Sequence, residues 1–152
     1  MHWYGNVPIG PELGLRALPE RSKDQMAQYL PPRRPRVLIV EDEFLIALDL
    51  QDAMSELGFD SCGLASTDTK ARSLAMEDQP DLVLMDVCLA GGREGIETAR
   101  WLRMACDASV IFVTASTDED TLERIHAQVP GATVLSKLNY RDRLADAVRS
   151  VS

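Results

Sequence analysis

The stretch Asp81-Leu82-Val83-Leu84-Met85-Asp86 decides the fold of this chain. Its four consecutive apolar residues between polar flanks are typical of a strand buried on both faces, as in a parallel sheet. A carboxylate at the end of such a strand lies at the carboxyl edge of the sheet, where open α/β folds place their chemistry. Three other apolar runs also end in polar groups: Val37–Val40 in Glu41 and Asp42, Val110–Val113 in Thr114, and Val134-Leu135 in Ser136 and Lys137.

Length and composition are those of a soluble globular protein. The 152 residues suggest one domain with a tail, and a content of 45% hydrophobic and 26% charged residues is enough for a core. No apolar run approaches the roughly 20 residues of a membrane span, and the N-terminus lacks the apolar segment of a secretion signal. Three scattered cysteines without a Cys-x-x-Cys pair fit a reducing cytoplasm better than a disulfide framework or a zinc site. We therefore expect a cytoplasmic protein.

The charge is distributed unevenly along the chain. Residues 1–36 carry six Lys/Arg and three Asp/Glu, whereas residues 37–152 carry ten and twenty-one, and the net charge of the whole chain is −8. Because an acidic domain repels a phosphate backbone, we do not expect the main body to bind nucleic acid directly.

Residues 1–35 differ in composition from the rest. They hold six of the eight prolines and three of the nine glycines, and their proline-rich end resembles a linker. Two interpretations of this N-terminal extension stay open. It is either a disordered leader, or a short arm that carries Trp3, Tyr4 and Tyr29 to a partner or to a second copy of the chain.

Regular periodicity begins at residue 36, and we expect residues 36–152 to form the folded domain. Strands are predicted at residues 37–40, 61–65, 82–86, 110–114 and 133–136, and helices at about 43–57, 67–77, 94–104, 118–128 and at the end of the chain. Thr117 is the predicted N-cap of the fourth helix. Five strands that alternate with five helices predict an α/β fold with a doubly wound parallel sheet.

In such a sheet the strand ends gather around one crevice, which would bring together Glu41, Asp42, Asp86, Thr114 and Lys137. Three carboxylates in one pocket repel one another unless a cation is present, and ligands that are all oxygen suit Mg²⁺. The lysine and the threonine suit contacts with a phosphoryl group, and a carboxylate can accept one as an aspartyl phosphate. The residues therefore indicate a Mg²⁺-dependent aspartyl-phosphate site with Asp86 as the acceptor.

These motifs together resemble the receiver domain of two-component response regulators, of the CheY-like kind, over about residues 36–150. The resemblance rests on Val37-Leu38-Ile39-Val40-Glu41-Asp42-Glu43 as the first strand and acidic pair, on Asp81–Asp86 as the phosphoacceptor strand, on Val113-Thr114-Ala115, and on Lys137. It implies a flavodoxin-like fold with strand order 2-1-3-4-5. It also implies a phosphoprotein of signal transduction, which takes part only in its own phosphorylation and dephosphorylation and is not otherwise an enzyme.

The resemblance further implies a role for each site residue and a set of partners. It implies that Asp86 is the phosphoacceptor, and that Mg²⁺ is bound by Glu41, Asp42, Asp86 and the backbone carbonyl of Cys88. Thr114 and Lys137 would contact the phosphoryl group. Cys88 and Ser116 would tune the lifetime of the phosphorylated state. The implied phosphoryl donor is a sensor histidine kinase or a histidine phosphotransfer protein. A downstream protein partner of unknown identity is also implied, whereas a membrane is not, and a homodimer stays open.

The sequence departs from the family pattern at three positions. Val134 stands where an aromatic switch residue is usual, and Glu41 stands where aspartate is commoner. Leu138 stands where proline usually follows the lysine, so the usual cis peptide bond is not expected. The chemistry of phosphorylation is therefore expected to be intact, whereas the usual relay of the signal is in doubt.

Alternatives to a phosphorylated regulator follow from these departures and from the acids themselves. Because the chain stops after the fifth predicted helix, we expect a stand-alone regulator that signals through protein contacts. A receiver-like adaptor, a binding module with rewired or lost switching, is the main alternative. A phosphatase with an aspartyl nucleophile would need a second aspartate where Cys88 stands. A purely structural interpretation has Asp86 capping its loop and Glu41 and Asp42 as acids at a helix N-terminus.

Overall fold

The computed structural model describes residues 3–4, 7–8, 28–90, 92 and 94–151, and the chain divides into two compact units, residues 1–33 and 34–152. In the first unit, β1 (Trp3–Tyr4) pairs antiparallel with β2 (Val7–Pro8). The choice between a leader and an arm concerns residues that lie mostly outside the described ones. The domain boundary after residue 35 likewise stays a prediction.

The second unit contains a five-stranded parallel sheet of order β4-β3-β5-β6-β7, which is the predicted order 2-1-3-4-5. Its strands are β3 (Arg36–Val40), β4 (Asp60–Ala65), β5 (Leu82–Met85), β6 (Ser109–Thr114) and β7 (Thr133–Ser136). Its helices are α3 (Phe44–Glu56), α4 (Asp68–Asp78), α5 (Gly95–Cys106), α6 (Glu119–Gln128) and α7 (Tyr140–Val151). The predicted doubly wound α/β fold is therefore confirmed. None of the helices in the described part of the chain is long and apolar enough to cross a membrane.

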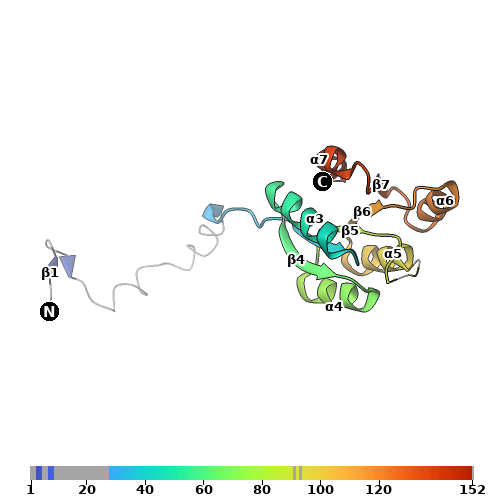
Figure 1. Ribbon diagram of the computed structural model, residues 1–152. Helices are drawn as coiled ribbons and strands as arrows, with labels where there is room; N and C mark the ends of the chain where they lie inside the picture. The colour runs from blue at the N-terminus through green and yellow to red at the C-terminus, as the bar shows by residue number, and fades with distance from the viewer. Residues whose placement is uncertain (1–2, 5–6, 9–27, 91, 93, 152) are drawn as a thin grey trace. The chain divides into compact units, whose positions relative to one another are not determined.

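Helices cover both faces of the sheet and make a three-layer sandwich (Figure 1). Successive side chains of a strand point to opposite faces, so each strand contributes to two cores. One core joins the sheet to α4, α5 and α6 through residues such as Val83, Met85, Phe112, Ala99 and Ile125. The other joins it to α3 and α7 through residues such as Ile39, Leu84, Leu50, Met54 and Leu144. All four residues of β5 are at most 2% exposed, as expected of a strand covered on both sides.

Side-chain caps define where two of the helices begin. The Thr67 hydroxyl accepts a hydrogen bond from the backbone N–H of Lys70 at the start of α4. At α6 the N-cap is Asp118, whose carboxylate accepts from the N–H of Thr121 at 2.9 Å. The prediction of Thr117 for this position was therefore wrong by one residue. Both residue types cap well, and the aspartate also places a negative charge at the positive end of the helix.

Candidate functional site

The register of the central strands brings the acidic residues together at the carboxyl edge of the sheet. Val40 at the end of β3 pairs with Met85 at the end of β5, so Glu41 and Asp86 leave the sheet side by side. The backbone N–H of Asp86 also donates to the carbonyl of Val40 at 2.9 Å. One carboxylate oxygen from each of Glu41, Asp42 and Asp86 lies within 4.8 Å of the others. We call these three residues the acidic cluster.

The members of the acidic cluster differ in their exposure to water. The side chains of Glu41 and Asp86 are only 1% and 4% exposed, whereas Asp42 lies in an exposed position. Asp42 is held by the loop after β5, because its carboxylate accepts from the backbone N–H of Ala90 at 3.2 Å. The Asp86 carboxylate accepts from the N–H of Cys88 at 3.3 Å. The cluster therefore combines two buried acids with one exposed acid.

Lys137 closes the site from the end of β7. Its side-chain nitrogen lies 3.0 Å from the Glu41 carboxylate and 2.9 Å from Oδ2 of Asp86, and its side chain is only 10% exposed. The same nitrogen contacts Oε1 of Glu43 at 2.8 Å. The backbone N–H of Lys137 donates to the carbonyl of Thr114 at 3.0 Å, which fixes the start of this loop.

Glu43 was quoted in the acidic first-strand motif, but the sequence analysis gave it no role. Two facts could have pointed to a role for Glu43: it follows the acidic pair directly, and a lysine has three N–H groups that need acceptors. Two carboxylates alone would leave one of these groups without a protein acceptor. Glu43 supplies the third acceptor.

Burial and charge act in opposite directions on the ionisable groups. Burial and, to a smaller extent, the charge of Asp86 raise the pKa of Glu41 to about 7, although hydrogen bonds from the Glu43 backbone and from Lys137 act to lower it. Burial tends to lower the pKa of Lys137, but hydrogen bonds to Glu43, Asp86 and Glu41 outweigh it and raise this pKa above its ordinary value. Lys137 is therefore charged at neutral pH, whereas the site still has an excess of carboxylates.

The donor set of this site fits a divalent cation that prefers oxygen. Oε2 of Glu41 is buried, and the side-chain nitrogen of Lys137 lies 3.0 Å from it. Three carboxylates within 4.8 Å of one another repel each other, and a divalent cation would relieve this repulsion. Mg²⁺ commonly binds one or two carboxylates and completes its shell with carbonyls, water and phosphate oxygens. The three acids are the groups that could hold such an ion.

Hydroxyl and thiol groups border the same edge of the sheet. Thr114 ends β6, is 1% exposed, and its hydroxyl accepts from the N–H of Ser116 at 3.1 Å. Met85 pairs with Phe112, so Thr114 lies only one residue beyond the position opposite Asp86. The sulfur of Cys88 lies 3.8 Å from the hydroxyl of Ser116, which links the loops after β5 and β6.

The positions that depart from the family pattern have ordinary surroundings. Val134 lies on β7, half-buried, and packs against the core beneath α4, α5 and α6. The side chain of Leu138 is 96% exposed. No cis peptide bond occurs in the described residues, in agreement with the absence of proline after Lys137.

Gly95, the first residue of α5, packs against the backbone of Asp86 and Val87, which directly follow β5. A Cβ atom added to this glycine would lie 1.9 Å from the carbonyl oxygen of Asp86 and 2.7 Å from that of Val87. The N–H of Gly95 donates to the carbonyl of Val87 at 3.0 Å. No side chain larger than hydrogen fits at this contact, which sequence reasoning did not identify.

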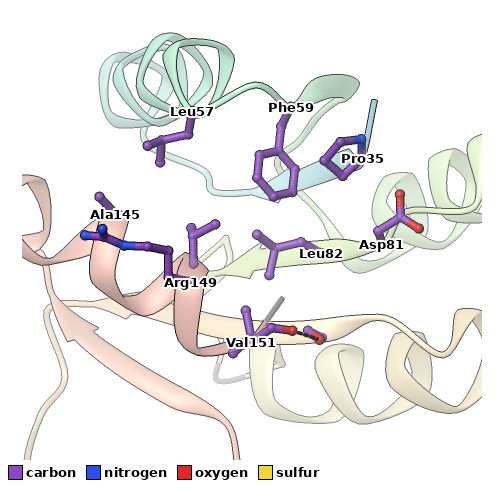
Figure 2. A pocket seen from close by; sticks show the side chains of 10 residues that line it. Pro35, Leu57, Phe59, Asp81, Leu82, Ala145, Arg149 and Val151 are labelled. Carbon is purple, nitrogen blue, oxygen red and sulfur yellow. Dashed lines mark hydrogen bonds between the residues drawn. The ribbon is translucent and has the colours of Figure 1, made fainter. Parts of the chain in front are cut away.

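A separate cavity lies at the opposite, amino edge of the sheet (Figure 2). It has a volume of about 680 Å³ and opens between α3 and α7. Leu57, Phe59 and Leu82 form much of its apolar lining, and Asp81 and Arg149 stand at its border. Because Asp81 precedes β5 whereas Asp86 follows it, this cavity is distinct from the acidic cluster.

Comparison with known proteins gives a family and several relatives. The model of the response regulator receiver domain matches residues 37–149. The chain is 41% identical over 80 residues to the phyllosphere-induced regulator PhyR of Methylorubrum extorquens, a match that covers 52% of this chain and 30% of PhyR. It is 39% identical over 89 residues to the transcriptional regulatory protein PdtaR of Mycobacterium tuberculosis, which covers 59% of this chain and 43% of PdtaR. The matches thus span less than half of these relatives.

Solved structures of receiver domains share the fold. The REC domain of the PhyR response regulator from Erythrobacter litoralis has a TM-score of 0.69 at 31% identity, with 78% of this chain and 89% of that chain covered. The signal receiver domain of a modulated diguanylate cyclase from Desulfovibrio desulfuricans has a TM-score of 0.69 at 34% identity, with 78% and 94% covered. Since the family model also matches well over half of the sequence, this chain belongs to the response regulator receiver domain family.

Proposed function

We propose that this receiver domain accepts a phosphoryl group on Asp86 from a sensor histidine kinase or a histidine phosphotransfer protein. The observation that supports this most is the position of Lys137, which follows β7 and yet contacts the carboxylates that follow β3 and β5. A cation that bridges two buried acids is the arrangement that phosphoryl transfer uses to neutralise charge. In this proposal the chain is a phosphoacceptor and does not turn over a separate substrate.

The transfer makes one bond and breaks one bond. A carboxylate oxygen of Asp86 attacks phosphorus, the bond from phosphorus to the donor's histidine nitrogen breaks, and the electron pair stays with that nitrogen. The N–H of Cys88 and the side chain of Lys137 hold the two Asp86 oxygens in place before transfer. Lys137 then pairs with an oxygen of the transferred group, and the Thr114 hydroxyl donates to another.

The acidic cluster is the proposed site for Mg²⁺. Asp42, Asp86 and the backbone carbonyl of Cys88 would hold the ion, and Glu41 would contribute through a water molecule. A bound ion would supply positive charge that offsets the negative charge of the phosphoryl oxygens. Cys88 and Ser116, whose side chains lie 3.8 Å apart beside this site, are the proposed determinants of how long the acyl phosphate lasts.

Exposed apolar side chains beside the site support a protein as the phosphoryl donor. Phe44 and Leu45, at the start of α3, are 66% and 80% exposed, and Leu138 is 96% exposed. Phe44 and Leu138 each follow one member of the Glu43–Lys137 contact, so they flank the acidic cluster. Apolar groups gathered at a polar site are typical of a protein docking surface. We propose a cytoplasmic regulator whose output is likewise a protein contact.

A second candidate is a receiver-like adaptor whose switching is rewired or lost, and the packing of Val134 into the core supports it. Treatment with acetyl phosphate and Mg²⁺, followed by measurement of the intact mass, separates the two. A regulator gains the mass of one phosphate, and Asp86→Asn abolishes the gain. Asp52→Asn, at an exposed position of α3, is the matched control and should behave as the wild type does. Absence of any Asp86-dependent gain would favour the adaptor.

A further inference from the structure

The side-chain ammonium group of Lys137 has no N–H to spare. Its three N–H groups meet three carboxylates, at 3.0 Å in Glu41, 2.9 Å in Asp86 and 2.8 Å in Glu43. A lysine has only three donors, so one contact must break before Lys137 can donate to an additional oxygen. If a phosphoryl group on Asp86 is to be contacted by Lys137, one of these carboxylates has to leave.

The three carboxylates differ in how much free energy is lost when each breaks its contact with Lys137. The side chain of Glu41 is 1% exposed, and a buried carboxylate that loses its cation is strongly destabilising. Asp86 carries the phosphoryl group itself, so its oxygens stay beside Lys137 after the transfer. The side chain of Glu43 is 61% exposed, so water replaces the lost contact at little cost. Glu43 is therefore the partner that exchanges most easily, although it makes the shortest of the three contacts.

The Glu43 side chain does not cap α3 and can therefore contact Lys137. Glu43 is the N-cap residue of α3, with φ −82° and ψ 102°, but its side chain makes no capping hydrogen bond. Aspartate, asparagine, serine and threonine are the usual residues at such a position, because their shorter side chains reach the helix N–H groups. The glutamate instead extends to Lys137. A change in this contact is therefore also a change at the N-cap of α3.

We propose that Glu43 is a positioning residue: it holds the third N–H of Lys137 in the unphosphorylated protein and is displaced by the phosphoryl group on Asp86. This inference rests on the proposed function. It goes beyond that function in naming the residue that the phosphoryl group releases and the helix, α3, at which the release occurs.

The experiment follows the nitrogen of Lys137 directly. The full chain contains only three lysines, Lys23, Lys70 and Lys137, so lysine labelled with ¹⁵N gives few side-chain NMR signals, and Lys137→Arg assigns the relevant one. Wild type and Glu43→Gln are compared with Mg²⁺ alone and with Mg²⁺ plus beryllofluoride, a mimic of the aspartyl phosphate. The Lys137 signals should differ between the two proteins with Mg²⁺ alone and coincide once beryllofluoride is bound.

The control is Glu94→Gln, which removes the same charge from the residue before α5. Glu94 is also an N-cap without a capping hydrogen bond, and its side chain is exposed. This variant should match the wild type in both states. The rate of phosphorylation by acetyl phosphate should rise in Glu43→Gln by about two- to fivefold over the control, as expected when an exposed ion pair is lost.

Each other outcome has a distinct meaning. Identical Lys137 signals with Mg²⁺ alone would overturn the proposal, because Glu43 would then not hold the lysine. A difference that persists with beryllofluoride would also overturn it, because Glu43 would then not be displaced. If the wild-type signal does not respond to beryllofluoride and the protein gains no phosphate, the proposed function itself has failed, and the inference falls with it.

Discussion

Replacing Gly95 with alanine should damage both the stability of the domain and its acidic site. The added Cβ would lie 1.9 Å from the carbonyl oxygen of Asp86, and real Cβ atoms essentially never approach closer than 3.0 Å. The contact must therefore open by about 1.1 Å. Both obstructing groups are backbone carbonyls of buried residues that directly follow β5, so no side chain can rotate away. Overpacking of this kind costs about 1–3 kcal/mol or more, and the intrinsic preference of helices for alanine returns up to about 1 kcal/mol. Because the clash is with backbone that cannot move aside, the cost lies at or above the upper end of this range, at about 3–4 kcal/mol, and we expect a net loss of about 2–3 kcal/mol.

Urea unfolding and phosphate uptake measure the two parts of this effect. For a domain of this size, a loss of about 2–3 kcal/mol lowers the urea midpoint by about 1–3 M. Because the strain acts on the carbonyl of Asp86 itself, uptake of phosphate from acetyl phosphate should also slow in protein that is still folded. Gly92→Ala is the matched control from the same loop. Its Cβ would meet nothing closer than the Glu94 side chain at 3.5 Å, so its stability should change by less than about 0.5 kcal/mol.

The reasoning would be refuted if Gly95→Ala and Gly92→Ala unfolded at the same urea concentration. It would be refuted in part if Gly95→Ala were unstable but took up phosphate at the rate of the control. The contact would then matter for folding alone and not for the geometry of Asp86.

Three further predictions concern individual charges. Burial acts to raise the pKa of Asp68, but hydrogen bonds from Thr98 and Arg72 and the charge of Arg72 lower it below the ordinary value. In urea unfolding above about pH 5, Asp68→Asn should therefore lower the free energy of unfolding by about 1 kcal/mol. This difference should shrink as the pH falls below about 4, where the carboxylate becomes protonated. Lys137→Met leaves two buried carboxylates unpaired and should lower thermal stability by about 2–4 kcal/mol, part of which Mg²⁺ restores in the same melting experiment. Asp42→Asn should weaken Mg²⁺ binding by at least about tenfold in a calorimetric titration while stability changes little, because this acid is exposed.

The fold could be predicted because its signals are local. The run Leu82–Met85 is apolar throughout because both of its faces are covered, and the amphipathic helices between the strands fix the parallel connections. The one wrong helix cap, Thr117, arose where two residues suited to the role stand side by side. The convergence of Glu41, Asp42, Asp86 and Lys137 followed from topology, because parallel strands bring their carboxyl ends to one edge.

Contacts that depend on side-chain paths and close approaches could not be predicted. The position of Glu43 directly after the acidic pair is only a partial signal, because its contact with Lys137 joins residues 94 positions apart and depends on the length of both side chains. Gly95 lies next to a loop that already contains glycines, and nothing in the sequence says which glycine meets a carbonyl. Tyr140 donates its hydroxyl to Asp49 across 91 positions, a pairing that only the packed α3 and α7 reveal.

These unpredicted contacts bear on how a signal could leave the site. Val134, at the position of the usual aromatic switch, packs into the core beneath α4, α5 and α6. Glu43 is instead the N-cap of α3, and Tyr140 is the first residue of α7 and donates a hydrogen bond to Asp49 within α3. Both helices lie on the opposite face of the sheet from the core that holds Val134. If a phosphoryl group draws Lys137 away from Glu43, the first backbone elements to respond are therefore α3 and the start of α7, and a change on this face requires no aromatic residue at position 134.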